Sequence, residues 1–122
     1  MHTCLVVDDS PVIRKVSRRI LEDLGFEVTE AGDGIKALAW CSAVMPDLIV
    51  LDWRMPEMDG LAFLRRLRQE PGGASPKVVL CSSETSIARV SEALGAGADE
   101  YLMKPFDSDL MASRLAHVGF AA

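Results

Sequence analysis

The sequence predicts an α/β fold in which one doubly wound, five-stranded parallel sheet lies between two layers of helices. Five short apolar runs recur along the 122 residues, and stretches with helical periodicity separate them. Every separating stretch is long enough to connect two parallel strands. Hydrophobic residues make up 49% of the chain and charged residues 25%, the balance of one ordinary globular domain.

Five strands are expected from the apolar runs. They are TCLVV at 3–7, EVTEA at 27–31, DLIVL at 47–51, KVVLC at 77–81 and EYLM at 100–103. The first, third and fourth runs are nearly continuous in Val, Leu and Ile, which is typical of strands buried on both faces of a parallel sheet. The second and fifth are more polar, so we expect them at the edges of the sheet.

Five helices are expected to follow the strands. The first has the clearest ends, because Ser10 can cap it, Pro11 suits the first helical position and Gly25 can close it. The side chains expected to face the sheet are Ile13, Val16, Ile20 and Leu24; Ile35, Leu38, Ala39 and Ser42; Leu61, Leu64 and Leu67; Ile87, Val90 and Leu94; and Leu110, Met111, Leu115 and Val118.

Charge and composition limit the kinds of partner. The formal net charge of −5 argues against nucleic acid as the main partner. The basic clusters RKVSRR at 14–19 and RRLR at 65–68 are interpreted as solvated helix faces. No apolar run reaches the ~20 residues of a membrane span, and no export signal is visible. Cys4, Cys41 and Cys81 form no CxxC pair, so we expect free thiols in a reducing, cytoplasmic compartment.

Polar side chains follow the expected strands at the points where the strands end. Asp8 and Asp9 follow the first, Asp52 the third, Ser82 the fourth and Lys104 the fifth. The carboxyl ends of parallel strands share one edge of the sheet, where ligands bind. Two carboxylates about 4 Å apart repel by roughly 4 kcal/mol at an effective dielectric near 20. Three of them invite a hard cation such as Mg²⁺. GxGxxG and P-loop patterns are absent, which excludes dinucleotide and nucleoside triphosphate sites of those kinds.

Four motifs together resemble those of one family. VVDDSP at 6–11, LDWRMPEMDG at 51–60, CSSE at 81–84 and YLMKPF at 101–106 are similar, in order and position, to the motifs of response regulator receiver domains of two-component systems. The resemblance covers essentially the whole chain and is greatest to stand-alone, CheY-like (chemotaxis-type) members. It implies a flavodoxin-like sheet of strand order 2-1-3-4-5, and a single receiver domain over 1–122 with no output domain.

The resemblance implies a role for each polar residue at the sheet edge. Asp52 would accept a phosphoryl group from a histidine of a partner kinase. Lys104 would pair with Asp52 at rest and with the phosphoryl oxygens afterwards. Asp9 would bind Mg²⁺ directly and Asp8 directly or through water, and Asp52 and the backbone carbonyl of Arg54 would complete the protein ligands. Alignment and charge neutralisation are what phosphoryl transfer needs from a protein, and these groups could supply both.

The resemblance also implies how the phosphoryl group would be sensed. Ser82 would be the switch hydroxyl, and Tyr101 the aromatic residue that turns inward on activation. The face formed by the fourth helix, fifth strand and fifth helix would then change. The peptide bond between Lys104 and Pro105 is expected to be cis.

Four residues near these motifs invite interpretation of their own. Arg54 and Glu84 are expected to rim the mouth of the pocket as an ion pair, which would either limit attack of water on the phosphoryl group or be a surface salt bridge only. Trp53 is interpreted as a packing residue. MDG at 58–60 is interpreted as a turn in which Gly60 supplies an unusual backbone angle.

Two functions remain open at this point. One is a phosphorylation-operated interaction switch that controls binding to a downstream protein target. The other is a phosphorelay shuttle that passes the phosphoryl group to a histidine phosphotransfer protein. The donor would be a sensor histidine kinase or a histidine phosphotransfer protein, with neither nucleic acid nor membrane as a partner. The chain would assist its own phosphorylation and dephosphorylation without being a dedicated enzyme.

Overall fold

The computed structural model describes residues 1–120 and contains one five-stranded parallel sheet. The strands are β1 (Thr3–Val7), β2 (Glu27–Ala31), β3 (Leu48–Asp52), β4 (Lys77–Ser82) and β5 (Glu100–Met103). Their order is β2-β1-β3-β4-β5, as predicted, and this order leaves the two more polar runs at the edges. The third strand lies one residue later than predicted, and the fourth is one residue longer.

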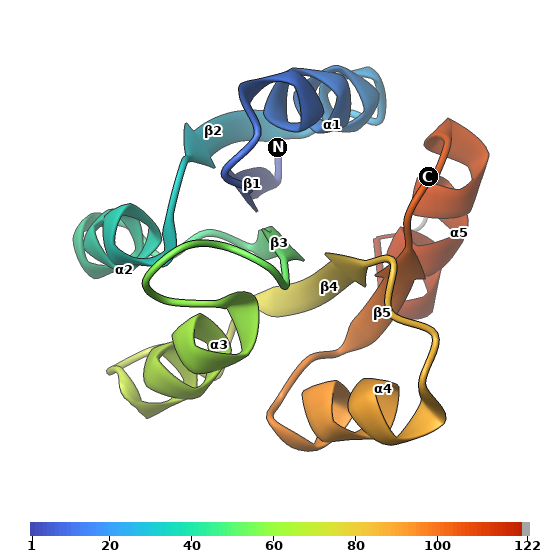
Figure 1. The fold of residues 1–122 in the computed structure, drawn as a ribbon. Coiled ribbons are helices and arrows are strands. Elements are labelled where there is room, and N and C mark those ends of the chain that lie inside the picture. The colour runs from blue at the N-terminus through green and yellow to red at the C-terminus, as the bar shows by residue number, and fades with distance from the viewer. Residues whose placement is uncertain (121–122) are drawn as a thin grey trace.

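Five helices cover the two faces of the sheet. They are α1 (Pro11–Asp23), α2 (Gly34–Ala43), α3 (Gly60–Gln69), α4 (Ile87–Gly95) and α5 (Ser108–His117). A polar side chain caps each helix by accepting the backbone N–H three residues later; the caps are Ser10, Asp33, Asp59, Ser86 and Asp107. In Figure 1, α1 and α5 lie on one face of the sheet, and α2, α3 and α4 lie on the other.

The hydrophobic core is split in two by the sheet. Side chains alternate along the central strands, so Val6 and Val50 pack with α1 and α5 while Leu5 and Ile49 pack with α2, α3 and α4. Because β1, β3 and β4 are buried on both faces, all three can be continuous in apolar residues. The residues at their carboxyl ends therefore follow buried segments of the sheet.

Three of the predicted helix faces are partly wrong. In α1, Val16 is 49% exposed, and the buried positions are Ser17 and Leu21. Ile13, Ile20 and Leu24 are half-buried beside them. The face is therefore rotated by about one residue, because the small Ser17 allows α1 to approach the sheet where Val16 would hold it away.

In α2 and α4 as well, small residues are buried where larger apolar residues were expected to be. In α2, Ile35 is 56% exposed, whereas the small residues Ala37 and Cys41 are buried. In α4, Ile87 is 84% exposed and Leu94 is also exposed, whereas Ala93 is buried. Ala39 and Ser42 are not buried either. Small residues mark the contact faces of these helices, and several of their large apolar residues lie in solvent.

The three cysteines are free thiols, as expected from the sequence. Cys4, Cys41 and Cys81 are all buried free thiols. Burial raises the pKa of Cys41 to about 11 and that of Cys81 to about 12, so both stay protonated at neutral pH. No helix within residues 1–120 has the length and apolar character needed to cross a membrane.

Gly60 is needed for a close approach and not for an unusual backbone angle, which corrects the interpretation of MDG. Its φ is not positive; the left-handed residue of this loop is Glu57, with φ of 68°. A Cβ atom on Gly60 would overlap the carbonyl oxygen of Asp52 and lie 2.9 Å from Cα of Trp53. The amide of Gly60 also donates to the carbonyl of Trp53 at 2.7 Å. The start of α3 therefore packs directly on the end of β3.

We expect Gly60→Ala to lower the free energy of unfolding by about 2 kcal/mol or more, because backbone atoms must move to admit the methyl group. Gly95→Ala is the matched control, since a Cβ there meets nothing within 4 Å. The control is expected to stay within about 1 kcal/mol of the wild type. Urea unfolding measures both variants, and equal stabilities would contradict the close-approach explanation.

Candidate functional site

The register of the sheet brings three carboxylates together. Val7 pairs with Leu51, so the next residues along the chain, Asp8 and Asp52, lie side by side at the carboxyl edge. One carboxylate oxygen from each of Asp8, Asp9 and Asp52 lies within 4.8 Å of the others. Asp8 is 4% exposed and Asp52 8%, whereas Asp9 is exposed to solvent. The predicted cluster is therefore present, with two members inside and one at the surface.

Lys104 lies across this cluster from the end of β5. Its Nζ donates to Oδ1 of Asp52 at 2.9 Å and to Oδ2 of Asp8 at 3.1 Å. The backbone N–H of Lys104 donates to the carbonyl of Ser82 at 2.9 Å, which holds the ends of β4 and β5 together. The peptide bond between Lys104 and Pro105 is cis, as expected.

Burial and charge shape the protonation of this pair. Burial raises the pKa of Asp52, as do the negative charges of Asp8 and Asp9, and the hydrogen bond from Lys104 only partly offsets this. For Lys104, burial acts to lower the pKa, but the hydrogen bonds and charges of Asp52 and Asp8 outweigh it and the pKa is raised. Lys104 is therefore positively charged at neutral pH. The raised pKa of Asp52 means that its negative charge is less favourable here than in water.

The donor set fits a divalent cation. Three carboxylates face one ammonium group, which leaves an excess of negative charge in a largely buried pocket. Oxygen donors from two buried carboxylates and one exposed carboxylate are the ligands that Mg²⁺ prefers, and the exposed side leaves room for the waters that Mg²⁺ retains. A cation at this place would offset repulsion that Lys104 alone does not remove.

Ser82 and Tyr101 are joined through the backbone of Glu84. The buried Ser82 hydroxyl accepts the N–H of Glu84 at 3.0 Å, and the Tyr101 hydroxyl donates to the carbonyl of Glu84 at 2.8 Å. The Tyr101 ring is buried and lies edge-on to the Trp53 ring, with centroids 6.4 Å apart. In this structure Tyr101 therefore points inward and is part of the core.

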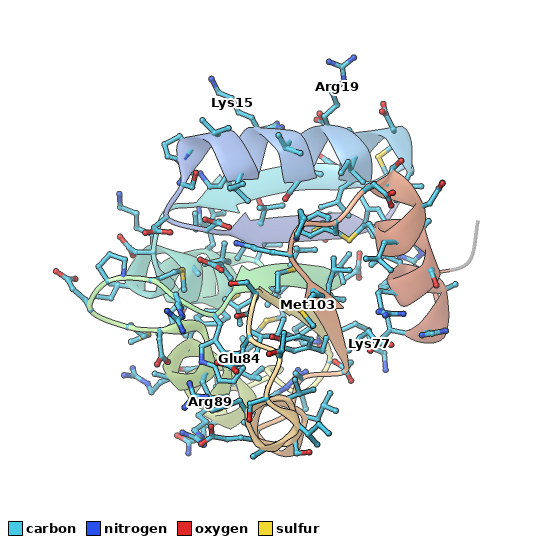
Figure 2. The ribbon with its side chains drawn as sticks, turned by 45° about the vertical axis from the view of Figure 1, so that its right-hand side comes forward. Lys15, Arg19, Lys77, Glu84, Arg89 and Met103 are labelled. Atoms are coloured by element: carbon cyan, nitrogen blue, oxygen red, sulfur yellow. The ribbon has the colours of Figure 1, made fainter. Side chains whose placement is uncertain are left out.

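Sequence reasoning did not identify the contact between Trp53 and α4. The Arg89 guanidinium lies over the Trp53 ring, 4.6 Å from its centroid. Trp53 is a packing residue, as interpreted, but its buried Nε1 has no hydrogen-bond partner within residues 1–120. Figure 2 labels Arg89 and Glu84, which both lie near the start of α4. No sequence pattern pairs Arg89 with Trp53, because the contact depends on where α4 lies.

The prediction of an ion pair between Arg54 and Glu84 is wrong. It is absent from the ion pairs formed within residues 1–120. Arg54 is exposed, and Oε1 of Glu84 instead accepts the N–H of Ser86 at 2.9 Å. The local turn that leads into α4 therefore holds the Glu84 carboxylate.

Comparison with known proteins agrees with this geometry. The family model for the response regulator receiver domain matches residues 4–116. CheY of Bacillus subtilis is 37% identical over 109 residues, which cover 88% of this chain and 89% of that protein. The DNA-binding dual master transcriptional regulator RpaA of Synechocystis sp. is 36% identical over 115 residues, 94% of this chain. The chain spans 48% of RpaA, about half its length.

A solved structure shows the same arrangement of strands and helices. The chemotaxis response regulator CheY4 of Vibrio cholerae matches with a TM-score of 0.91 and 34% identity, over 97% of this chain and 98% of that one. A match of this extent takes in the whole of the sheet and both layers of helices. The chain therefore belongs to the response regulator receiver domains of two-component systems, in their CheY-like form.

Proposed function

We propose that this receiver domain accepts a phosphoryl group on Asp52 in the presence of Mg²⁺ and uses it to change the surface formed by α4, β5 and α5. The observation that carries the proposal is the bond from Lys104 to both Asp52 and Asp8 inside the carboxylate cluster. A phosphoryl acceptor needs positive charge close to it, and here a candidate cation site and an ammonium group both adjoin one carboxylate.

Asp52 is the proposed acceptor because it ends the central strand and already contacts Lys104. A carboxylate oxygen of Asp52 attacks the phosphorus of a phosphohistidine on the partner. The new P–O bond forms as the P–N bond breaks, and the histidine nitrogen keeps the electron pair of the broken bond. The product is an acyl phosphate whose new charge lies beside Lys104.

The proposed cation ligands are the carboxylates of Asp8, Asp9 and Asp52 and the backbone carbonyl of Arg54. A bound Mg²⁺ supplies positive charge to the oxygens of the transferring group. Lys104 would supply a second positive charge to the same oxygens, and burial of Asp8 and Asp52 would strengthen both interactions. The chain itself would thus assist phosphorylation and dephosphorylation.

The proposed switch runs through Glu84. Ser82, whose hydroxyl now accepts the Glu84 N–H, would donate its own proton to a phosphoryl oxygen. A shift of Ser82 moves the Glu84 backbone, to which the Tyr101 hydroxyl is bonded. The affected surface includes Ile87, Leu94 and Met103, which are large, apolar and exposed. Such residues favour a protein partner at this surface.

We expect Asp52→Asn to abolish labelling by a small-molecule phosphodonor in Mg²⁺, because Asp52 ends the central strand opposite Lys104, whereas Asp8 and Asp9 are proposed to hold the cation. Asp59→Asn is the matched control, since Asp59 is exposed and asparagine can still cap α3. Intact-mass spectrometry measures the labelled fraction. Full labelling of the Asp52 variant would overturn the assignment.

We also expect Asp52→Asn to raise the melting temperature by a few degrees at neutral pH without Mg²⁺. Since the folded pKa of Asp52 is raised, its charged form destabilises the fold above that pKa, and the cost fades as pH falls toward the ordinary value of 3.8. Lys104 keeps Asp8 as a partner in the variant.

The difference in melting temperature between Asp52→Asn and the wild type is therefore expected to shrink at low pH, where wild-type Asp52 is protonated. Mg²⁺ should also reduce it, by binding the wild-type folded state. Differential scanning calorimetry across pH, with and without Mg²⁺, measures the difference. A lower melting temperature for the variant at neutral pH would contradict the electrostatic argument.

The identity of the partner separates the switch from the shuttle. We expect the protein loaded with beryllofluoride, a phosphoryl mimic, to retain a downstream protein that the unmodified protein does not retain. Substituting the exposed Ile87 by Ser tests whether the α4 surface makes the contact, and Val44→Ser at the end of α2 is the control. Affinity capture followed by mass spectrometry identifies the partner. Recovery of a histidine phosphotransfer protein alone would favour the shuttle.

A further inference from the structure

The segment Asp8–Ser10, here called the acidic loop, is tied to α1 and β2 by one side chain. Nη1 of Arg14 donates to the backbone carbonyl of Asp8 at 2.7 Å. Nε of the same guanidinium donates to Oε1 of Glu30 on β2 at 3.1 Å. Arg14 and Glu30 are both partly buried. The planar guanidinium of Arg14 therefore joins the acidic loop, which carries two carboxylates, to Glu30 on β2.

The Asp8 carboxylate is held firmly without Arg14. Its Oδ1 accepts the N–H of Ser10 at 2.9 Å, and its Oδ2 accepts Nζ of Lys104 at 3.1 Å. The backbone N–H of Asp8 donates to the carbonyl of Ala31 at 3.2 Å. The remaining polar group of Asp8 is its carbonyl, and Arg14 is the side chain that holds it.

Asp9 depends on the backbone for its direction. Its carboxylate is exposed and forms no hydrogen bond or ion pair within residues 1–120. The peptide plane between Asp8 and Asp9 begins at the carbonyl that Arg14 holds. Rotation of this plane would swing the Asp9 carboxylate away from Asp8 and Asp52. The Arg14 contact therefore lies one peptide bond from Asp9, whose carboxylate has no hydrogen-bond partner within residues 1–120.

The charge of Arg14 is balanced locally, so its effect on the cluster is mainly one of direction. Glu30 also accepts Nη1 of Arg18 at 2.9 Å, and Nε of Arg18 donates to Glu22 at 3.3 Å. Two cations and two anions thus form one network. The hydrogen bond from Arg18, and then that from Arg14, lower the pKa of Glu30, which keeps this anchor ionised at neutral pH.

The rest of the basic cluster at 14–19 behaves differently. Figure 2 shows Lys15 and Arg19 pointing from α1 into solvent, away from the sheet. Arg14 and Arg18 lie on the side of α1 that contacts β2, through Glu30. The interpretation of RKVSRR as a solvated face therefore holds for two of its four basic residues, Lys15 and Arg19, whereas Arg14 and Arg18 belong to the network.

We propose that Arg14 is a positioning residue, which holds the peptide between Asp8 and Asp9 so that the Asp9 carboxylate is already directed at a divalent cation. The inference rests on the proposed function, because it assumes that the carboxylate cluster binds Mg²⁺. A guanidinium can donate in two directions from one plane, whereas a lysine ammonium is a single point charge. Lysine therefore keeps the charge of Arg14 and loses the geometry.

The test compares Mg²⁺ affinity in Arg14→Lys and Arg14→Ala with that of the wild type. All proteins carry Trp40→Phe, because Trp40 lines the same surface groove as Arg14 and its removal leaves Trp53, beside Asp52, as the fluorescent reporter. We expect both Arg14 variants to bind Mg²⁺ about tenfold more weakly. Arg18→Ala is the matched control, since Arg18 shares Glu30 but does not contact the acidic loop.

A second measurement needs no metal. The Ser10 amide donates to Asp8 within the acidic loop, so its hydrogen exchange in metal-free protein reports how firmly the loop is held. We expect exchange at Ser10 to be several-fold faster in both Arg14 variants and unchanged in Arg18→Ala. Loss of the Arg14 charge alone would strengthen Mg²⁺ binding, since a nearby cation repels the ion. Weaker Mg²⁺ binding with unchanged exchange at Ser10 would overturn a positioning role, because the acidic loop would then be held as firmly without Arg14.

The remaining outcomes separate the inference from the proposed function. Asp9→Ala is the reference variant and is expected to lose the Mg²⁺-dependent change in Trp53 fluorescence. If Asp9→Ala loses it and Arg14→Lys keeps wild-type affinity, the inference about Arg14 is overturned and the cation site stands. If the wild type itself shows no Mg²⁺ binding by fluorescence or calorimetry, the proposed cation site and the inference fail together.

Discussion

Repulsion among carboxylates at one edge of the sheet is the constraint on which the rest of the structure depends. Asp8 and Asp52 are adjacent because β1 and β3 are paired in register, and both side chains are buried. Two buried carboxylates beside each other destabilise a fold unless positive charge is close. Lys104 supplies one such charge by bonding to both. The same imbalance that costs stability favours a cation at this edge.

The two ends of the sheet differ in their side-chain hydrogen bonds. At the amino end, Arg68 donates to the carbonyls of Gly73, Pro76 and Gly97 and to the carboxylate of Asp99. These bonds tie the loop before β4 to the loop before β5. At the carboxyl end, the links between Glu84 and its neighbours are few, and single hydroxyl groups make several of them. Many bonds therefore converge on one side chain at the amino end, whereas at the carboxyl end single hydroxyl groups join Glu84 to β4 and β5.

Much of the fold and of the candidate site could be predicted because local patterns carry it. Continuous apolar runs indicate strands buried on both faces, and the polar character of β2 and β5 places them at the edges. The proximity of Asp8, Asp52 and Lys104 could be predicted from the sequence, since parallel strands end at a common edge. The prediction of an ion pair between Arg54 and Glu84 was wrong, because in the turn before α4 the Glu84 carboxylate accepts a hydrogen bond from the Ser86 amide.

The sequence by itself determined the order of the elements, the Ser10 cap of α1 and the set of polar groups at the carboxyl edge, because each of these depends on neighbours in the chain or on strand pairing. Only the tertiary structure decided which side of α1 meets the sheet, where Ser17 is buried and Val16 is exposed. It also decided that Arg89 lies on Trp53 and that Arg14 reaches the Asp8 carbonyl. Those contacts depend on how closely a helix approaches the sheet, and that distance is decided by the volume of all the side chains packed between them.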